Sequence, residues 1–111
     1  MHELSLCRSI VAISVRHAEG KPVARVHVRV GHLRQVVPHA LARCFELVAP
    51  ASGLGGAVLE ITEVAAEVRC RACGETTVLE RFELRCGACG GSDLDVIAGE
   101  ELLVESLEFV D

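Results

Sequence analysis

The sequence predicts an α+β fold in which two helices pack on a small, mostly antiparallel sheet with an inserted four-cysteine zinc-ribbon module. Three observations predict it: helical spacing of apolar residues in two stretches, strand-like alternation in several others, and two Cys-x-x-Cys pairs close together in the chain. A chain of 111 residues fits one domain, or one domain plus a small appendage that cannot support its own core. Aromatic residues make up only 3% of the chain, so the core is expected to consist of aliphatic side chains.

Two amphipathic helices are expected in the first half of the chain. Apolar residues recur at three- or four-residue steps over residues 3–17, and again in a stretch that Pro38 opens and Pro50 stops. Cys7 and Cys44 fall on these apolar faces. A free cysteine in such a position behaves as a small hydrophobe, so both are expected in the core.

Strands are expected before, between and after these features. Residues 25–30 alternate strictly between charged and Val side chains, which is typical of a strand with one buried face. Residues 58–64 alternate similarly and run towards Val68. After the cysteines, residues 94–98 and 102–110 predict two strands around a turn, both returning to the main sheet. The expected domains are therefore 1–67 plus 93–111, and a cysteine module at 68–92.

Four cysteines in two close pairs predict one zinc ion in a closed tetrathiolate site. Each pair is followed by a glycine, which permits the positive φ of a tight turn and lets backbone N–H groups approach the sulfurs. Twelve residues separate the pairs, and a strand pair around Val78 and Phe82 would make this module a zinc ribbon. The expected ligands are Cys70, Cys73, Cys86 and Cys89.

Two other uses of these cysteines, a redox pair and a catalytic zinc site, fit the sequence less well. Redox Cys-x-x-Cys motifs usually occur singly beside a βαβ pattern, which is not found here. A catalytic zinc keeps one coordination position open, whereas four thiolates close it. A structural zinc that supplies most of the folding free energy of this small module is therefore the expected role.

The first three residues form a second candidate metal site. The amine of Met1, the amide nitrogens of His2 and Glu3, and the His2 imidazole lie a few bonds apart and can form fused chelate rings. Nitrogen donors of this kind favour square-planar Ni(II) or Cu(II). By itself, a histidine at position two is usually just an exposed residue, so the motif needs further support.

The combination of motifs resembles the HypA/HybF family of hydrogenase nickel-incorporation proteins over essentially the whole chain. The residues that carry the resemblance are the Met1-His2-Glu3-Leu4-Ser5 start, the Phe45-Glu46 helix, the Leu59-Glu60-Ile61 strand, the paired Cys-x-x-Cys motifs and the closing Glu105-Ser106-Leu107-Glu108 segment. The family implies a nickel-binding α/β domain with an inserted zinc domain.

The resemblance also implies a function and partners. It implies a metallochaperone, not an enzyme, that carries Ni(II) to the [NiFe]-hydrogenase large subunit and works with a maturation GTPase, and in some relatives with urease maturation proteins. His2 would anchor nickel, Met1 would add its amine, and Glu3 its amide nitrogen, while the four module cysteines would hold zinc. Some relatives have an acidic residue near the start of the second helix; here His39 occupies that region, as a ligand or as an ordinary exposed histidine.

Two other functions, nucleic-acid binding and enzyme catalysis, fit the sequence less well. A zinc-ribbon nucleic-acid-binding module would need basic or stacking side chains, but acidic residues offset the arginines of the module and the chain has no Tyr or Trp. No nucleophile–base constellation or phosphate-binding glycine loop predicts an enzyme. His17, His27 and His32 are expected to be surface residues rather than ligands.

The net charge of −5 and the scattered basic residues make non-specific nucleic-acid binding unexpected. The apolar run at 9–15 is too short to span a membrane and lacks the features of a signal peptide. A cytoplasmic protein with reduced cysteines is expected, as a monomer or a homodimer.

Overall fold

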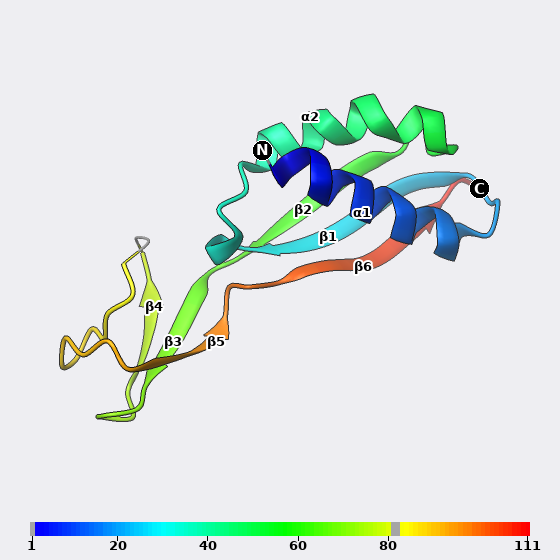
Figure 1. Ribbon diagram of the computed structural model, residues 1–111. Coiled ribbons are helices and arrows are strands. Elements are labelled where there is room, and N and C mark those ends of the chain that lie inside the picture. Colours follow the sequence, from blue (N-terminus) through cyan, green and yellow to red (C-terminus); the bar gives the residue numbers. More distant parts are fainter. Residues whose placement is uncertain (1, 81–82) are drawn as a thin grey trace. The chain divides into compact units, whose positions relative to one another are not determined.

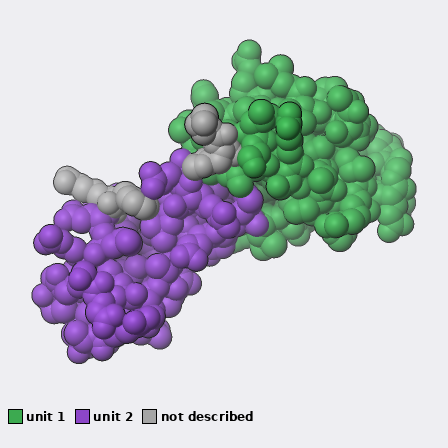
Figure 2. Space-filling view, viewed as in Figure 1, with its two compact units in different colours: residues 1–29, 36–62, 103–111 green, residues 30–35, 63–102 purple. Residues whose placement is uncertain are grey.

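The computed structural model describes residues 2–80 and 83–111, with the side chain of His2 outside the description. The chain forms two compact units, shown in two colours in Figure 2. Unit 1 comprises residues 1–29, 36–62 and 103–111. Unit 2 comprises residues 30–35 and 63–102, so it extends beyond the expected module at 68–92.

Unit 1 consists of two helices and a three-stranded sheet with the order β2-β1-β6 (Figure 1). The elements are α1 (His2–Ala18), β1 (Val23–Gly31), α2 (Pro38–Val48), the 3₁₀ turn η2 (Ala49–Ser52), β2 (Val58–Val64) and β6 (Leu102–Phe109). The first helix ends where Glu19 and Gly20 adopt positive φ, and an end at Gly20 was expected from the sequence. Pro38 is the first residue of α2, a position where its missing N–H costs nothing. The predicted α+β class is confirmed.

The core of unit 1 forms where the helices contact one face of the sheet. Val26 and Val28 on β1 are almost fully buried, as are Ile10 on α1 and Phe45 on α2. The only buried polar side chain among the described residues is Ser14, whose hydroxyl donates a 2.7 Å hydrogen bond to the Ile10 carbonyl of its own helix. The alternating pattern of β1 therefore places its charged side chains on the opposite, solvated face.

Unit 2 is built on a second three-stranded sheet with the order β4-β3-β5. Its strands are β3 (Ala66–Cys70), β4 (Thr76–Leu79) and β5 (Leu94–Ala98), and it also contains the short turn η1 (His32–Arg34). Both β4 and β5 pair antiparallel with β3. The expected strand at Val78 is present as β4, whereas Phe82, its expected partner, lies outside the described residues.

One strand expectation is wrong. Residues 94–98 were expected to return to the main sheet with residues 102–110, but only β6 does so, while β5 pairs with β3 in unit 2. The reason lies in the cysteines. Only three residues separate Cys89 from Asp93, so a chain that leaves the cysteine cluster emerges directly beside Cys70, whose register partner is Leu94.

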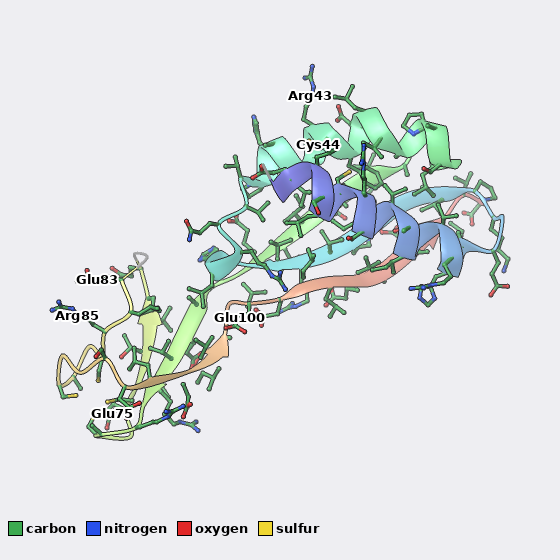
Figure 3. All side chains as sticks on the ribbon, in the orientation of Figure 1. Arg43, Cys44, Glu75, Glu83, Arg85 and Glu100 are labelled. Carbon is green, nitrogen blue, oxygen red and sulfur yellow. The ribbon has the colours of Figure 1, made fainter. Side chains whose placement is uncertain are left out.

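Cys7 is fully buried, as expected, and Cys44 is half-buried. Burial raises the pKa of the Cys7 thiol, and the nearby Cys44 adds to the effect. In Figure 3 the Cys44 label marks its position on α2.

Within the part of the chain that the structure describes, no helix combines the length and the apolarity needed to cross a bilayer.

Candidate functional site

The two Cys-x-x-Cys turns have the same local geometry. In the first, Gly74 has a φ of +79° and donates a 2.8 Å hydrogen bond to the carbonyl of Cys70. In the second, Gly90 has a φ of +74° and donates a 2.9 Å bond to the carbonyl of Cys86. Only glycine adopts this φ without strain, so the sequence pattern Cys-x-x-Cys-Gly specifies each turn locally.

The turns bring the four predicted sulfurs together. The Sγ atoms of Cys70 and Cys89 are 3.7 Å apart, and those of Cys73 and Cys86 are 3.6 Å apart. All four lie within 4.8 Å of one another. A tetrahedral zinc ion with bonds of about 2.3 Å would separate its sulfurs by about 3.8 Å. The donor set and its spacing therefore fit a zinc ion bound by four thiolates.

The backbone distinguishes the sulfurs electrostatically. The N–H groups of Cys89 and Ala88 each donate to Cys86 Sγ at 3.4 Å, and they lower the pKa of this thiol to about 6. The pKa of Cys73 rises to about 12: the N–H of Glu75 favours its thiolate, but hydrogen bonding with the neighbouring sulfurs, first that of Cys86, outweighs it. The backbone N–H groups thus favour the thiolate form of Cys86 over that of Cys73.

The second expected site lies at the N-terminal end of α1. Met1 and the side chain of His2 are outside the described residues, so the structure places only Glu3 of the three predicted nickel residues. Its Oε2 accepts a 3.3 Å hydrogen bond from the N–H of Val37. This bond brings the first turn of α1 to the residue that precedes α2, where His39 is exposed.

A third group of potential ligands was not found from the sequence. His27, Glu60 and Glu108 each offer an atom within 4.8 Å of the others. They lie on three different strands, and Arg25 forms ion pairs with both carboxylates, at 3.2 and 3.5 Å. Both nitrogens of the His27 ring also contact these carboxylates. Because arginine and histidine already engage the carboxylates, we interpret the group as an ion-pair network.

A comparison with protein families gives a match over residues 1–109 to the model described as "Hydrogenase/urease nickel incorporation, metallochaperone, hypA". The chain belongs to the HypA family. A hydrogenase maturation factor HypA from a Nostoc species is 42% identical over 97% of this chain and 95% of its own. That from Geotalea uraniireducens is 43% identical over 97% and 98%, respectively. The resemblance noted from the sequence motifs is thereby confirmed.

Solved structures share the fold of this HypA family member. The solution structure of the Ni metallochaperone HypA from Helicobacter pylori superposes with a TM-score of 0.72 at 24% identity, covering 99% of this chain and 98% of the other. A second solution structure of a HypA protein gives a TM-score of 0.70 at 24% identity, with 99% and 97% coverage. The two helices and small sheets thus belong to a fold that recurs in solved HypA structures.

Proposed function

We propose that this chain is a nickel metallochaperone for hydrogenase maturation that binds Ni(II) at its N-terminus and delivers it to the hydrogenase large subunit. The observation that carries the proposal is the family match over residues 1–109, which includes both the Met1-His2-Glu3 start and the four cysteines. The ligands proposed for nickel are the Met1 amine, the His2 imidazole and amide nitrogen, and the Glu3 amide nitrogen. Such nitrogen donors suit square-planar Ni(II).

The position of Glu3 supports the proposal. Its carboxylate accepts the bond from Val37, so the side chain is held against the start of α2 instead of extending freely. The backbone nitrogen of Glu3 lies in the first turn of α1. A terminal site of this kind is reachable by an acceptor protein, which a delivery protein requires.

We propose zinc as the resident metal of the four-cysteine cluster, with a structural role. The sulfur separations of 3.6 and 3.7 Å support it. The ion pairs of the arginines make nucleic-acid binding less favourable, because Arg71 and Arg85 already pair with carboxylates of unit 2.

Partners of a HypA-type protein would include a maturation GTPase and, as the family description suggests, urease maturation proteins.

Nickel titration tests the N-terminal site. Untagged, zinc-loaded protein is titrated with Ni(II) by calorimetry, beside His2→Ala and the control His17→Ala, which removes an exposed histidine from the other end of α1. We expect tight binding by the wild type and by His17→Ala, and at least about tenfold weaker binding by His2→Ala. Equal affinity of the wild type and His2→Ala would reject the proposed site. A tag ahead of Met1 must be avoided because it would block the amine.

Delivery needs a separate measurement. Protein loaded with radiolabelled nickel is mixed with a nickel-free hydrogenase large subunit, and the label is followed on the subunit. Transfer should be faster than from a small-molecule chelator of matched affinity, because a docked carrier presents the ion directly. Transfer at the same rate would leave binding intact but contradict the chaperone role.

A further inference from the structure

The side chain of Arg71, inside the first cysteine turn, hydrogen-bonds the segment that follows the second cysteine turn. Its Nε and Nη2 atoms donate to Asp95 Oδ1 at 3.0 and 2.5 Å, and its Nη1 donates to Asp93 Oδ1 at 3.2 Å. The backbone N–H of Arg71 also donates to the Asp93 carbonyl at 2.9 Å. One residue therefore makes four hydrogen bonds to the segment that enters β5.

This contact joins the two cysteine turns. Arg71 directly follows Cys70 in the first turn, and Asp93 comes four residues after Cys89 in the second. The same segment supports the second turn, since the N–H of Cys86 donates a 2.8 Å bond to the Gly91 carbonyl. Movement of the first turn away from the second must therefore break the bonds of Arg71.

Charge gives the contact a second effect. The hydrogen bonds from Arg71 to Asp93 and Asp95 join a cation to carboxylates, and such charge-assisted bonds are stronger than those between neutral groups. The two aspartates hold the guanidinium in place, and hydrogen bonding to Arg71 lowers the pKa of Asp95. A planar guanidinium that donates to two carboxylates has little freedom, which a lysine could not reproduce.

Arg85 provides a contrast within the same unit. It directly precedes Cys86, so it also lies next to a cysteine of the cluster. Its Nε, however, is 3.7 Å from the carboxylate of Glu83, only two residues away, and its side chain is 69% exposed. Figure 3 labels both residues on the segment that leads to the second cysteine pair. Arg85 thus supplies a similar charge without linking the two turns.

We propose that Arg71 is a positioning residue of the cysteine cluster and that, with Asp93 and Asp95, it slows the opening of the Cys70–Cys73 turn and the loss of bound metal. The inference rests on the proposed zinc site and concerns how long the ion stays bound. It requires no change in the ligands themselves. Residues outside the four cysteines then set the lifetime of the metal complex.

The test is the rate at which full-length, zinc-loaded protein releases zinc to an excess of a chromogenic chelator. Arg71→Ala should release zinc about two- to tenfold faster, the range expected when a partly exposed arginine loses two carboxylate partners. Arg71→Lys should fall between Arg71→Ala and the wild type. Asp95→Asn combined with Arg71→Ala should be no faster than Arg71→Ala alone, because both changes break one contact. Arg85→Ala should match the wild type.

Cobalt substitution separates positioning from loss of the site. Wild type and Arg71→Ala should give the same absorption spectrum of tetrahedral thiolate-bound Co(II), since the four ligands are unchanged. A wild-type release rate in Arg71→Ala, an equal acceleration in Arg85→Ala, or an altered cobalt spectrum in Arg71→Ala would each overturn the proposal. If the wild type takes up no zinc at all, the proposed zinc site itself is rejected.

Discussion

At the scale of single residues, Gly31 and Gly99 allow their two backbone segments to approach closely within unit 2. A Cβ atom added to Gly31 would lie 1.9 Å from the carbonyl oxygen of Gly99. The N–H of Gly31 donates to the Glu101 carbonyl, and that of Leu33 to the Gly99 carbonyl, both at 2.8 Å. Any side chain at position 31 would therefore have to push these hydrogen-bonded backbones apart.

Gly31→Ala should lower the free energy of unfolding by about 3 kcal/mol, because the clash is with backbone and cannot be relieved by a side-chain rotation. The matched control is Gly55→Ala, where the nearest atom to the new Cβ would be 3.7 Å away and the change should stay within about 0.5 kcal/mol. Urea unfolding followed by circular dichroism suits a chain without Trp or Tyr. Equal stability of the two variants would show that the backbones can separate at little cost.

At the scale of elements, the solvated face of β1 carries a network that links all three strands of its sheet. Arg25 and His27 on β1 pair with Glu60 on β2 and with Glu108 on β6. The hydrogen bond with His27, and then the charge of Arg25, lower the pKa of Glu108 below its ordinary value. The ionised form of Glu108 is therefore favoured by folding.

The sign of the pH effect follows from that lowered pKa. The stabilisation by Glu108 is fully present above the ordinary pKa of about 4.5 and is lost as the pH falls through the lower, folded-state value. Glu108→Gln should thus have a lower melting temperature than the wild type above pH 5, and the difference should shrink towards pH 3. Glu46→Gln, at an exposed position on α2, is the control. A difference that stays constant with pH would exclude a charge effect.

At the scale of the whole molecule, the two units differ in how much apolar side-chain surface they bury. Unit 1 has a core of aliphatic side chains with Phe45 at its centre. In the described part of unit 2, the buried side chains are few and small: Val30, Ala66, Val68, Cys70 and Cys86. A unit with so little buried apolar surface is expected to need the proposed zinc ion to fold.

Removal of zinc should therefore unfold unit 2 selectively. After treatment with a strong chelator at neutral pH, NMR amide signals of β3, β4 and β5 should collapse towards random-coil positions, while those of α1 and α2 keep their dispersion. Cys73→Ala should produce the same spectrum without a chelator. Zinc loss with unchanged signals from these three strands would contradict the structural role.

Much of the fold could be predicted because its signals are local. The first helix was expected at residues 3–17 and spans His2–Ala18, and the second begins at Pro38 as expected. The zinc candidates were found from spacing alone, since each pair closes within a five-residue turn. The pairing of β5 was missed, because periodicity identifies a strand but not its neighbour.

The sequence by itself determined the helices, the strand at β1, the four clustered cysteines and, through combined motifs, the HypA family. These features depend on residues a few positions apart, whose geometry the local chain dictates. Only the tertiary structure decided that β5 joins β3, that Arg71 reaches Asp95, and that His27 meets a carboxylate 81 residues away. Such contacts depend on strand order and register, which are set by closure of the cysteine cluster and by which faces are buried.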